Sequence, residues 1–270
     1  MAKLNFGCGS RISPDWINID FHSTVPGVQR ANLLAGFPFE DSFFDAVYSS
    51  HVLEHFTPSQ ALSLMTECYR VLKPNGILRT VVPDLEGTCR EYLSIIGLPD
   101  SNPEKAEKYE WILIELLDQL VRSTPRGTMG SFYDRILSTG NKKLMAYVRS
   151  RTESALFEPQ EKKNYLQRIR GLSFEKVSTK IIYWYLRFVA SLIPGNLRSM
   201  VYVATGLGER HRWMYDCYSL KRLYLEVGFR DVEFLKYNIS AIPHFNEDCL
   251  DSNPDGMSYK NNSIYCEATK

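Results

Sequence analysis

The stretch Lys3-Leu4-Asn5-Phe6-Gly7-Cys8-Gly9-Ser10 decides the fold of this 270-residue chain. Its first half is a short apolar run that a glycine stops, as in a buried strand that ends in a tight turn. Gly7 and Gly9 allow the backbone to bend sharply and to approach a ligand where a side chain would collide. The stretch therefore predicts a strand followed by a ligand-binding turn.

A second apolar run, from Trp16 to Asp20, ends in a carboxylate. At the carboxyl end of a second parallel strand, this acid can accept both hydroxyls of a ribose, beside the crevice where open α/β sheets bind ligands. A dinucleotide fingerprint needs glycine where Ile12 stands and an acid roughly 20 residues on, whereas Asp20 follows Gly9 by eleven. No Gly-Lys-Ser/Thr of a P-loop occurs either. The pattern favours a ligand with a ribose and no pyrophosphate, such as S-adenosylmethionine, over a nicotinamide dinucleotide.

Further strands are expected at residues 44–49, 77–82, 229–235 and 264–268, and residues 31–34 are a weak third strand, the end of one, or a surface loop. The strand at 44–49 delivers Ser49, Ser50 and His51 to the carboxyl edge of the sheet. The last two strands form a closing antiparallel pair. The sequence thus predicts an α/β fold with a doubly wound, mostly parallel, seven-stranded Rossmann-like sheet.

Helix signals lie between these strands. A helix begins after Thr57, because threonine can cap it, Pro58 suits its first turn and Gln60 completes a capping box. Ser219 is expected to cap a last helix, which Gly228 ends. Between the first two strands, residues 10–15 are too few for the full helix that normally crosses between parallel strands.

The middle of the chain has a different pattern. Residues 87–207 read as a helical insertion that forms a lid and selects the substrate, because loops and lids carry function on a rigid scaffold. Residues 1–86 and 208–270 then form the cofactor-binding domain. Within the insertion, helices are expected at 107–122, at 132–148 with a break at Gly140, at 161–170 and at 174–193.

Four motifs appear in order, at residues 4–10, 16–20, 37–56 and 70–79. Together they resemble the class I S-adenosylmethionine-dependent methyltransferases, and within them the type 11 methyltransferase-domain group, whose members often lie beside glycosyltransferases. The resemblance is close over residues 3–85 and loose over 211–235. It implies S-adenosylmethionine as cofactor, S-adenosylhomocysteine as product, and a small-molecule or glycan acceptor.

The resemblance also implies where the cofactor is held. Asn32 and Leu33 would edge the adenine, and His51 would lie at the methionine end. The full set expected to bind the cofactor is Asn5, Phe6, Gly7, Cys8, Gly9, Ser10, Asp20, Phe21, Asn32, Leu33, Ser49, Ser50 and His51.

Methyl transfer is an in-line displacement in which well-oriented geometry can supply roughly 7–11 kcal/mol. An oxygen acceptor, which we expect here, gains from a nearby base, whereas an amine or thiolate needs less help. Histidine suits this task near neutral pH. His51 and His211 are therefore the first catalytic candidates, and Asp84, just beyond the strand at 77–82, comes after them.

The run from His51 to His55 matches the His-x-x-Glu-His pattern of one zinc-peptidase group, in which both histidines lie on one helical face. Here a strand is expected to end at about Ser49, and the next helix is capped only at Thr57. With no helix through the motif, the sequence predicts no metal site. Glu54 and His55 are then supporting or structural groups.

Composition bears on nucleic-acid binding, on cysteine-based sites and on location. A formal net charge of +1 leaves no basic footprint for nucleic acid. Six scattered cysteines without a Cys-x-x-Cys pair indicate neither a zinc site nor a disulfide framework. The chain opens directly into its first strand with no signal peptide, so a cytoplasmic location is expected.

The most apolar stretch, residues 181–193, is too short for a bilayer, which takes roughly 20 apolar residues, and Arg187 interrupts it. A buried helix is favoured over an interfacial membrane helix or a pocket wall for a lipid-like substrate.

The expected function is methyl transfer. Two alternatives stay open: an aminopropyl-type transfer on the same fold, and a partner subunit that binds the cofactor without catalysis.

Overall fold

The computed structural model describes residues 1–21, 23, 25–152, 184–185, 188–189, 191–205 and 208–270. Its centre is a seven-stranded sheet in the order β3-β2-β1-β4-β5-β7-β6. The strands are β1 (Lys3–Phe6), β2 (Ile17–Asp20), β3 (Val28–Arg30), β4 (Phe44–Ser50), β5 (Leu72–Pro83), β6 (Arg230–Leu235) and β7 (Ser263–Thr269). The mostly parallel, seven-stranded sheet expected from the sequence is confirmed.

Strands β3, β2, β1, β4 and β5 pair in parallel, whereas β7 pairs antiparallel with both β5 and β6. From β1 the chain moves outward to β2 and β3, then returns to β4 on the other side of β1. The strand order therefore reverses between β1 and β4. In open α/β sheets this reversal opens a crevice outside the carboxyl ends of the strands, where ligands bind.

The third strand lies earlier than the sequence analysis expected. It covers Val28–Arg30, and a short 3-10 helix (Leu33–Ala35) follows it. The reason is the side chain of Asn32, which accepts a hydrogen bond from the Leu34 N–H and so caps the 3-10 turn.

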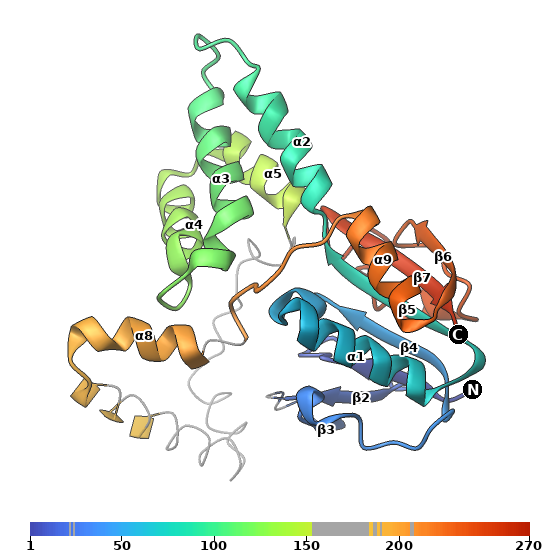
Figure 1. Cartoon of the computed structure of the whole chain (residues 1–270). Coiled ribbons are helices and arrows are strands. Elements are labelled where there is room, and N and C mark those ends of the chain that lie inside the picture. The colour runs from blue at the N-terminus through green and yellow to red at the C-terminus, as the bar shows by residue number, and fades with distance from the viewer. Residues whose placement is uncertain (22, 24, 153–183, 186–187, 190, 206–207) are drawn as a thin grey trace, which may run out of the picture.

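Helices α1 (Pro58–Val71) and α9 (Cys217–Val227) pack together on one face of the sheet (Figure 1). The capping box of Thr57 and Gln60 at the start of α1 is present as predicted. At α9 the cap is Asp216, one turn earlier than expected, and Ser219 is the third helical residue that completes this box. Gly228 ends α9 in a left-handed conformation, as predicted.

No helix lies between β1 and β2, as predicted, and the opposite face of the sheet is covered from elsewhere. Trp16 packs there with residues of the segment 236–252, which returns from β6. Lys3 reaches from β1 to an ion pair with Asp248 of this segment at 2.9 Å and lies over the Trp16 ring. The C-terminal segment thus takes the place of the missing crossover helix.

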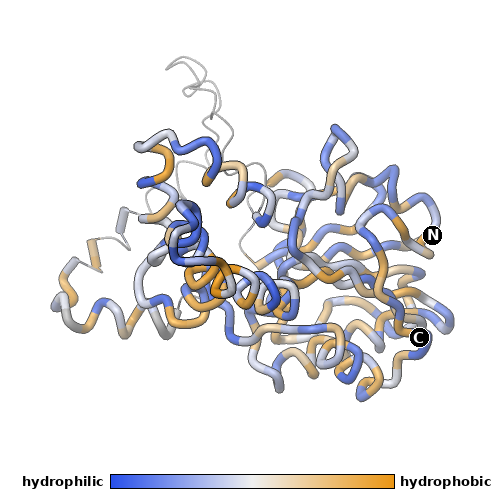
Figure 2. The backbone as a smooth tube through the Cα atoms, turned by 90° about the horizontal axis from the view of Figure 1, so that it is seen from above, coloured by the Kyte–Doolittle hydropathy of each residue, from blue (hydrophilic) through white to orange (hydrophobic). Residues whose placement is uncertain are grey.

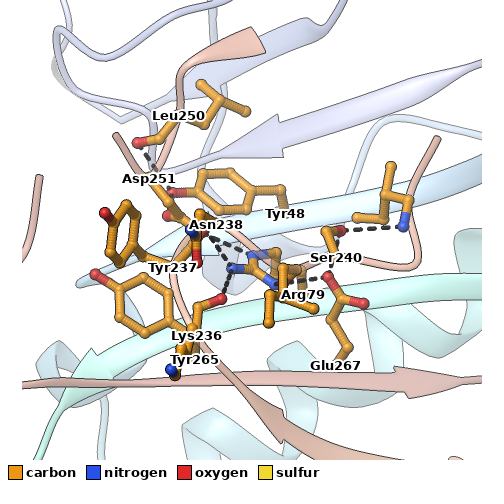
Figure 3. Close-up of polar contacts among 12 residues, drawn as sticks. Tyr48, Arg79, Lys236, Tyr237, Asn238, Ser240, Leu250, Asp251, Tyr265 and Glu267 are labelled. Atoms are coloured by element: carbon orange, nitrogen blue, oxygen red, sulfur yellow. Dashed lines mark hydrogen bonds and ion pairs between the residues drawn. The ribbon is translucent and has the colours of Figure 1, made fainter. Parts of the chain in front are cut away.

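A buried arginine ties this segment to the sheet (Figure 3). Arg79 of β5 is fully buried, and its guanidinium donates to Asp251 Oδ2 and Glu267 Oε1, both at 2.7 Å. It also donates to the carbonyl oxygens of Lys236, Tyr237 and Ile239. All the contacts are charge-assisted, so the segment is fixed against the sheet at several points.

The remaining described helices are α2 (Leu85–Ile96), α3 (Lys105–Val121), α4 (Gly127–Thr139), α5 (Lys142–Arg151) and α8 (Gly195–Thr205). Helices α2 to α5 form a lobe that stands off the sheet, with a separate apolar cluster centred on Trp111 and Phe132 (Figures 1 and 2). The predicted helices at 107–122 and 132–148 are confirmed, and Gly140 breaks the latter in a left-handed conformation.

The predicted helix at 161–170 lies outside the described residues, as does most of 174–193. The expectation that residues 181–193 are buried is wrong for the part that is described, because Trp184, Phe188 and Leu192 are exposed. Among the residues that are described, no helix is both long and apolar enough to cross a bilayer.

Candidate active site

A cavity of about 310 Å³ opens at the reversal of strand order, outside the ends of β1 and β4. Seven of the residues predicted to bind the cofactor line it: Asn5, Gly7, Cys8, Gly9, Ser10, Ser50 and His51. The structure therefore brings the glycine turn after β1 and the residues that end β4 to one space, as the sequence analysis expected.

The two glycines of the turn have different roles. Both have left-handed backbone, with φ of +62° at Gly7 and +54° at Gly9. A Cβ at Gly7 would lie 2.4 Å from Val52 Cγ2, so this glycine lets the turn pack against the connection after β4. A Cβ at Gly9 would meet nothing within 4 Å. Gly9, rather than Gly7, is thus the position where the backbone faces open space.

Asp20, at the end of β2, is joined to this turn. Its Oδ2 accepts the Gly9 N–H at 2.9 Å, and its Oδ1 accepts the Ser23 N–H at 2.8 Å. These bonds orient the Asp20 carboxylate, which is not itself among the residues that line the cavity.

Six predicted cofactor residues are not part of the cavity lining: Phe6, Asp20, Phe21, Asn32, Leu33 and Ser49. Phe6 and Leu33 belong to the apolar core, and Ser49 is buried. Phe21 and Asn32 are exposed after β2 and β3, on the side of the sheet where Asp20 ends its strand. The Cys8 thiol, whose pKa burial raises to about 12, is not a nucleophile at neutral pH.

Four lining residues were not identified from the sequence: Arg11, Tyr48, Tyr259 and Lys260. Arg11 holds the C-terminal segment by donating to the carbonyl oxygens of Cys249 and Ser252, and its guanidinium lies 4.3 Å from the Tyr259 ring centre. This segment closes the cavity on the side where the crossover helix is missing. An arginine and a tyrosine so far apart in the chain carry no local signal of this contact.

A second cavity, of about 380 Å³, lies between the sheet and the helical lobe. His51 and Lys260 line both cavities, so the two spaces meet at these side chains. The second cavity is further lined by residues of the lobe, among them Glu115, Gln119, Arg122 and Tyr133. Burial lowers the pKa of Lys260 to about 8.

Three histidines surround the buried carboxylate of Glu54 at this second cavity. His51 Nδ1 lies 3.4 Å and His211 Nε2 lies 4.0 Å from Glu54 Oε1. The rings of His55 and His211 meet edge to face, with centroids 5.1 Å apart. The Arg212 and Trp213 N–H groups donate to the Glu54 carbonyl, which fixes the His211 segment beside the end of β4.

Burial controls the charge of these groups. It lowers the pKa of His211 to about 3 and that of His51 well below its usual value, so both imidazoles are neutral at pH 7. Burial also raises the pKa of Glu54. His51 Nε2 further contacts Ser263 Oγ at 2.9 Å. His51 and His211, two predicted catalytic residues, thus share one cluster.

Asp84, the third catalytic candidate, caps helix α2. Its Oδ1 accepts the Gly87 N–H at 2.9 Å, which is the ordinary contact of an N-cap aspartate. Trp213 and Tyr215, which follow His211 closely in the sequence, line a separate cavity of about 350 Å³ against α9.

Residues 8–80 match the family model described as a methyltransferase domain. Over these residues the chain is similar to a methyltransferase domain. The match covers Cys8 to Ser10 of the turn after β1, Asp20, β4 and α1, and it supports the methyltransferase resemblance seen in the sequence.

One curated relative resembles a short part of the chain. The "probable methyltransferase ltbC" of Aspergillus luteorubrus is 42% identical over 53 residues, which are 19% of this chain and 19% of that protein. The chain therefore spans about a fifth of the length of the curated relative that it matches.

Solved structures of methyltransferases are similar at low identity. A SAM-dependent methyltransferase from Archaeoglobus fulgidus superposes over 100% of this chain and 86% of that chain, with a TM-score of 0.39 and 13% identity. Another from Methanosarcina mazei covers 34% of this chain and 59% of that chain, with a TM-score of 0.29 and 22% identity.

Proposed function

We propose that the protein transfers the methyl group of S-adenosylmethionine to an oxygen of a small-molecule or glycan acceptor. One observation carries this proposal: the cavity beside the methyltransferase-domain turn and the cavity beneath the helical lobe meet at His51 and Lys260. A two-substrate transfer needs two binding spaces that touch at one point. The first would hold the cofactor and the second the acceptor.

On the cofactor side, Asp20 would bind the ribose hydroxyls, and the backbone at Gly9 would let the ligand approach closely. Bound S-adenosylmethionine supplies a methyl group that its positive sulfonium already activates. The protein holds the acceptor at attack distance and excludes water, and the C-terminal segment anchored by Arg11 closes the cofactor side.

On the acceptor side, His51 and His211 stay our proposed catalytic residues, because both border the acceptor cavity as neutral imidazoles that can accept a proton. Glu54 lies next to both and would stabilise the positive charge that follows. The helical insertion at 87–207 supplies much of the acceptor cavity wall, which supports its proposed role as a substrate-selecting lid.

Isothermal titration of the full chain with S-adenosylmethionine tests the first half of the proposal, and release of S-adenosylhomocysteine with a panel of hydroxyl-bearing acceptors tests the second. Binding followed by release is the expected result. Binding without release from any acceptor would favour a non-catalytic partner subunit. An absence of binding would overturn the whole proposal.

Replacing Asp20 with alanine is expected to weaken S-adenosylmethionine binding. The change removes two charge-assisted hydrogen bonds to the ribose, a loss of about 1.5–3 kcal/mol, or about 10- to 150-fold in Kd. Titration calorimetry measures it. Asp15→Ala is the control, because Asp15 is an exposed acid on the connection that leads into β2. Equal Kd values for parent and Asp20→Ala would contradict the assignment of Asp20.

Replacing His211 with alanine is expected to lower turnover by about 10²–10⁴-fold while leaving the Kd for S-adenosylmethionine nearly unchanged. The reason is position: His211 lines the acceptor cavity and not the cofactor cavity. Steady-state kinetics and calorimetry on the same preparation separate the two effects. A loss of cofactor affinity with normal turnover at saturation would make His211 a cofactor contact instead.

A further inference from the structure

The carboxylate of Glu54 poses a physical problem that the proposed methyl transfer does not solve. The side chain is completely buried, and within the described part of the chain neither oxygen has a hydrogen-bond partner. Burying an ionised carboxylate without pairing costs several kcal/mol, and buried polar atoms in folded proteins nearly always have partners. Lys260 acts on this carboxylate through its charge but does not hydrogen-bond to either oxygen. A directly bound neighbour is therefore missing, and a cation is the neighbour that a carboxylate binds best.

Two imidazoles face the same space. Glu54, His55 and His211 each offer one ligand atom, and these atoms all lie within 4.8 Å of one another. Bonds from zinc to nitrogen or oxygen are about 2.0–2.2 Å, so ligand atoms around one ion lie within roughly 4 Å of each other. Glu54 Oε1 and His211 Nε2 are already at 4.0 Å. Side-chain rotations that move these ligand atoms by about 1 Å would bring all three to bonding distance from one ion.

The surroundings hold these ligands in place. His55 Nδ1 donates to the Arg210 carbonyl at 2.9 Å, which directs its Nε2 away from the backbone. Donation of the second ring nitrogen to a carbonyl is the usual way in which a metal-binding histidine is oriented. The backbone N–H of His211 donates to the backbone carbonyl of Gln119 in α3. This bond anchors the segment that carries His211, the third proposed ligand.

We propose that Glu54, His55 and His211 bind one divalent transition-metal ion of the zinc type. Two imidazoles and one carboxylate suit zinc, iron(II) or cobalt(II) rather than magnesium or calcium, which prefer oxygen ligands. Three protein ligands leave at least one coordination position, as in catalytic rather than structural zinc sites. All three residues line the acceptor cavity, so that position faces the acceptor.

One consequence rests on the proposed function. An acceptor hydroxyl that occupies the open position would have its pKa lowered by the ion and would lose its proton more readily. His211 would then act as a ligand and not as the base. The binding of the ion itself does not depend on methyl transfer.

The site differs from the zinc-peptidase pattern of the sequence. His51 follows β4 directly, and only Leu53–His55 forms a 3-10 turn, so no helix presents His51 and His55 on one face. The fold supplies His211 from a distant segment instead. The local spacing of His51, Glu54 and His55 therefore carries no signal of this site, because His211 is far from them in the sequence.

Metal content of the untagged full chain tests the proposal. The protein is treated with a chelator, incubated with zinc and then separated from unbound metal. The zinc that it retains is measured by inductively coupled plasma mass spectrometry. Cobalt(II) is titrated in parallel, because its visible absorption reports coordination geometry. The parent is expected to retain about one zinc ion per chain and to give an intense, tetrahedral-type cobalt spectrum.

Glu54→Gln and His211→Gln are each expected to lower the affinity for zinc at least about tenfold, whereas His244→Gln should bind zinc as the parent does. His244 is the control because it also contacts a glutamate, Glu247, but is exposed. Circular dichroism verifies folding, and if Glu54→Gln fails to fold, His55→Gln replaces it. No zinc on the parent, or equal zinc on parent and ligand variants, would overturn the site. Titration with S-adenosylmethionine is read separately, so failure of metal binding is distinguishable from failure of the proposed function.

Discussion

Replacing Arg79 with methionine is expected to lower the free energy of unfolding by about 3–5 kcal/mol, because it leaves two buried carboxylates without their cation. Asp251 and Glu267 are both buried and both depend on the Arg79 guanidinium (Figure 3). Urea denaturation at pH 8, followed by tryptophan fluorescence, measures the change.

The same variant is expected to be less impaired at pH 5 than at pH 8. Burial raises the pKa of Asp251, and Arg79 opposes this rise, so loss of Arg79 raises the pKa further. In this variant the folded state then binds more protons than the unfolded state, and its stability falls as pH rises. Arg90→Met, which removes an exposed arginine paired with Glu86, should match the parent at both pH values. Similar losses for the two variants would contradict the proposed importance of the buried network.

Replacing Gly7 with valine is expected to abolish S-adenosylmethionine binding. Two effects combine: a left-handed backbone that a β-branched residue adopts poorly, and a Cβ that would lie 2.4 Å from Val52 Cγ2. The turn after β1 must therefore move, and with it the Gly9 N–H that orients Asp20. Titration calorimetry measures binding, and circular dichroism shows how much helix remains.

Gly140→Val is the matched control. Gly140 has nearly the same φ, +65°, but a Cβ there would meet nothing within 4 Å. It should lose stability through backbone strain while keeping the cofactor affinity of the parent. A second test compares the single variant Gly7→Ala with the double variant Gly7→Ala/Val52→Ala. The smaller residue at position 52 relieves part of the clash, so the double variant should bind the cofactor better than the single one. Normal binding by Gly7→Val would show that the cofactor is held elsewhere.

The sheet could be predicted from the sequence because its signals are local. Apolar runs stopped by Gly7 and Pro83, the capping box at Thr57 and the missing crossover at residues 10–15 all act within a few residues. Residues 31–34 neither form nor end the third strand, because Asn32 caps a 3-10 turn there. A polar side chain that competes for backbone hydrogen bonds is invisible to a count of apolar residues.

The candidate site was predicted only in part, because most of its contacts join residues that are far apart in the sequence. The turn at Gly7 and Gly9 was identified, and the structure places it at the cavity. Tyr259 and Lys260 were not identified, because they are more than 230 residues from this turn in the sequence. They reach the cavity only through tertiary packing, such as that of Arg11 on the Tyr259 ring. The grouping of His55 with His211 likewise exists only in three dimensions.

The position of β7 in the sheet has a consequence for biosynthesis. β7 is made after β6 yet lies between β5 and β6, so β6 has no neighbour in the sheet until the ribosome has added residues 263–269. Until then Arg79 also lacks Glu267. The nascent chain therefore exposes the unpaired edge of β5 throughout translation of the helical lobe, and the cavity outside β1 and β4 can close only after Tyr259 and Lys260 have been added.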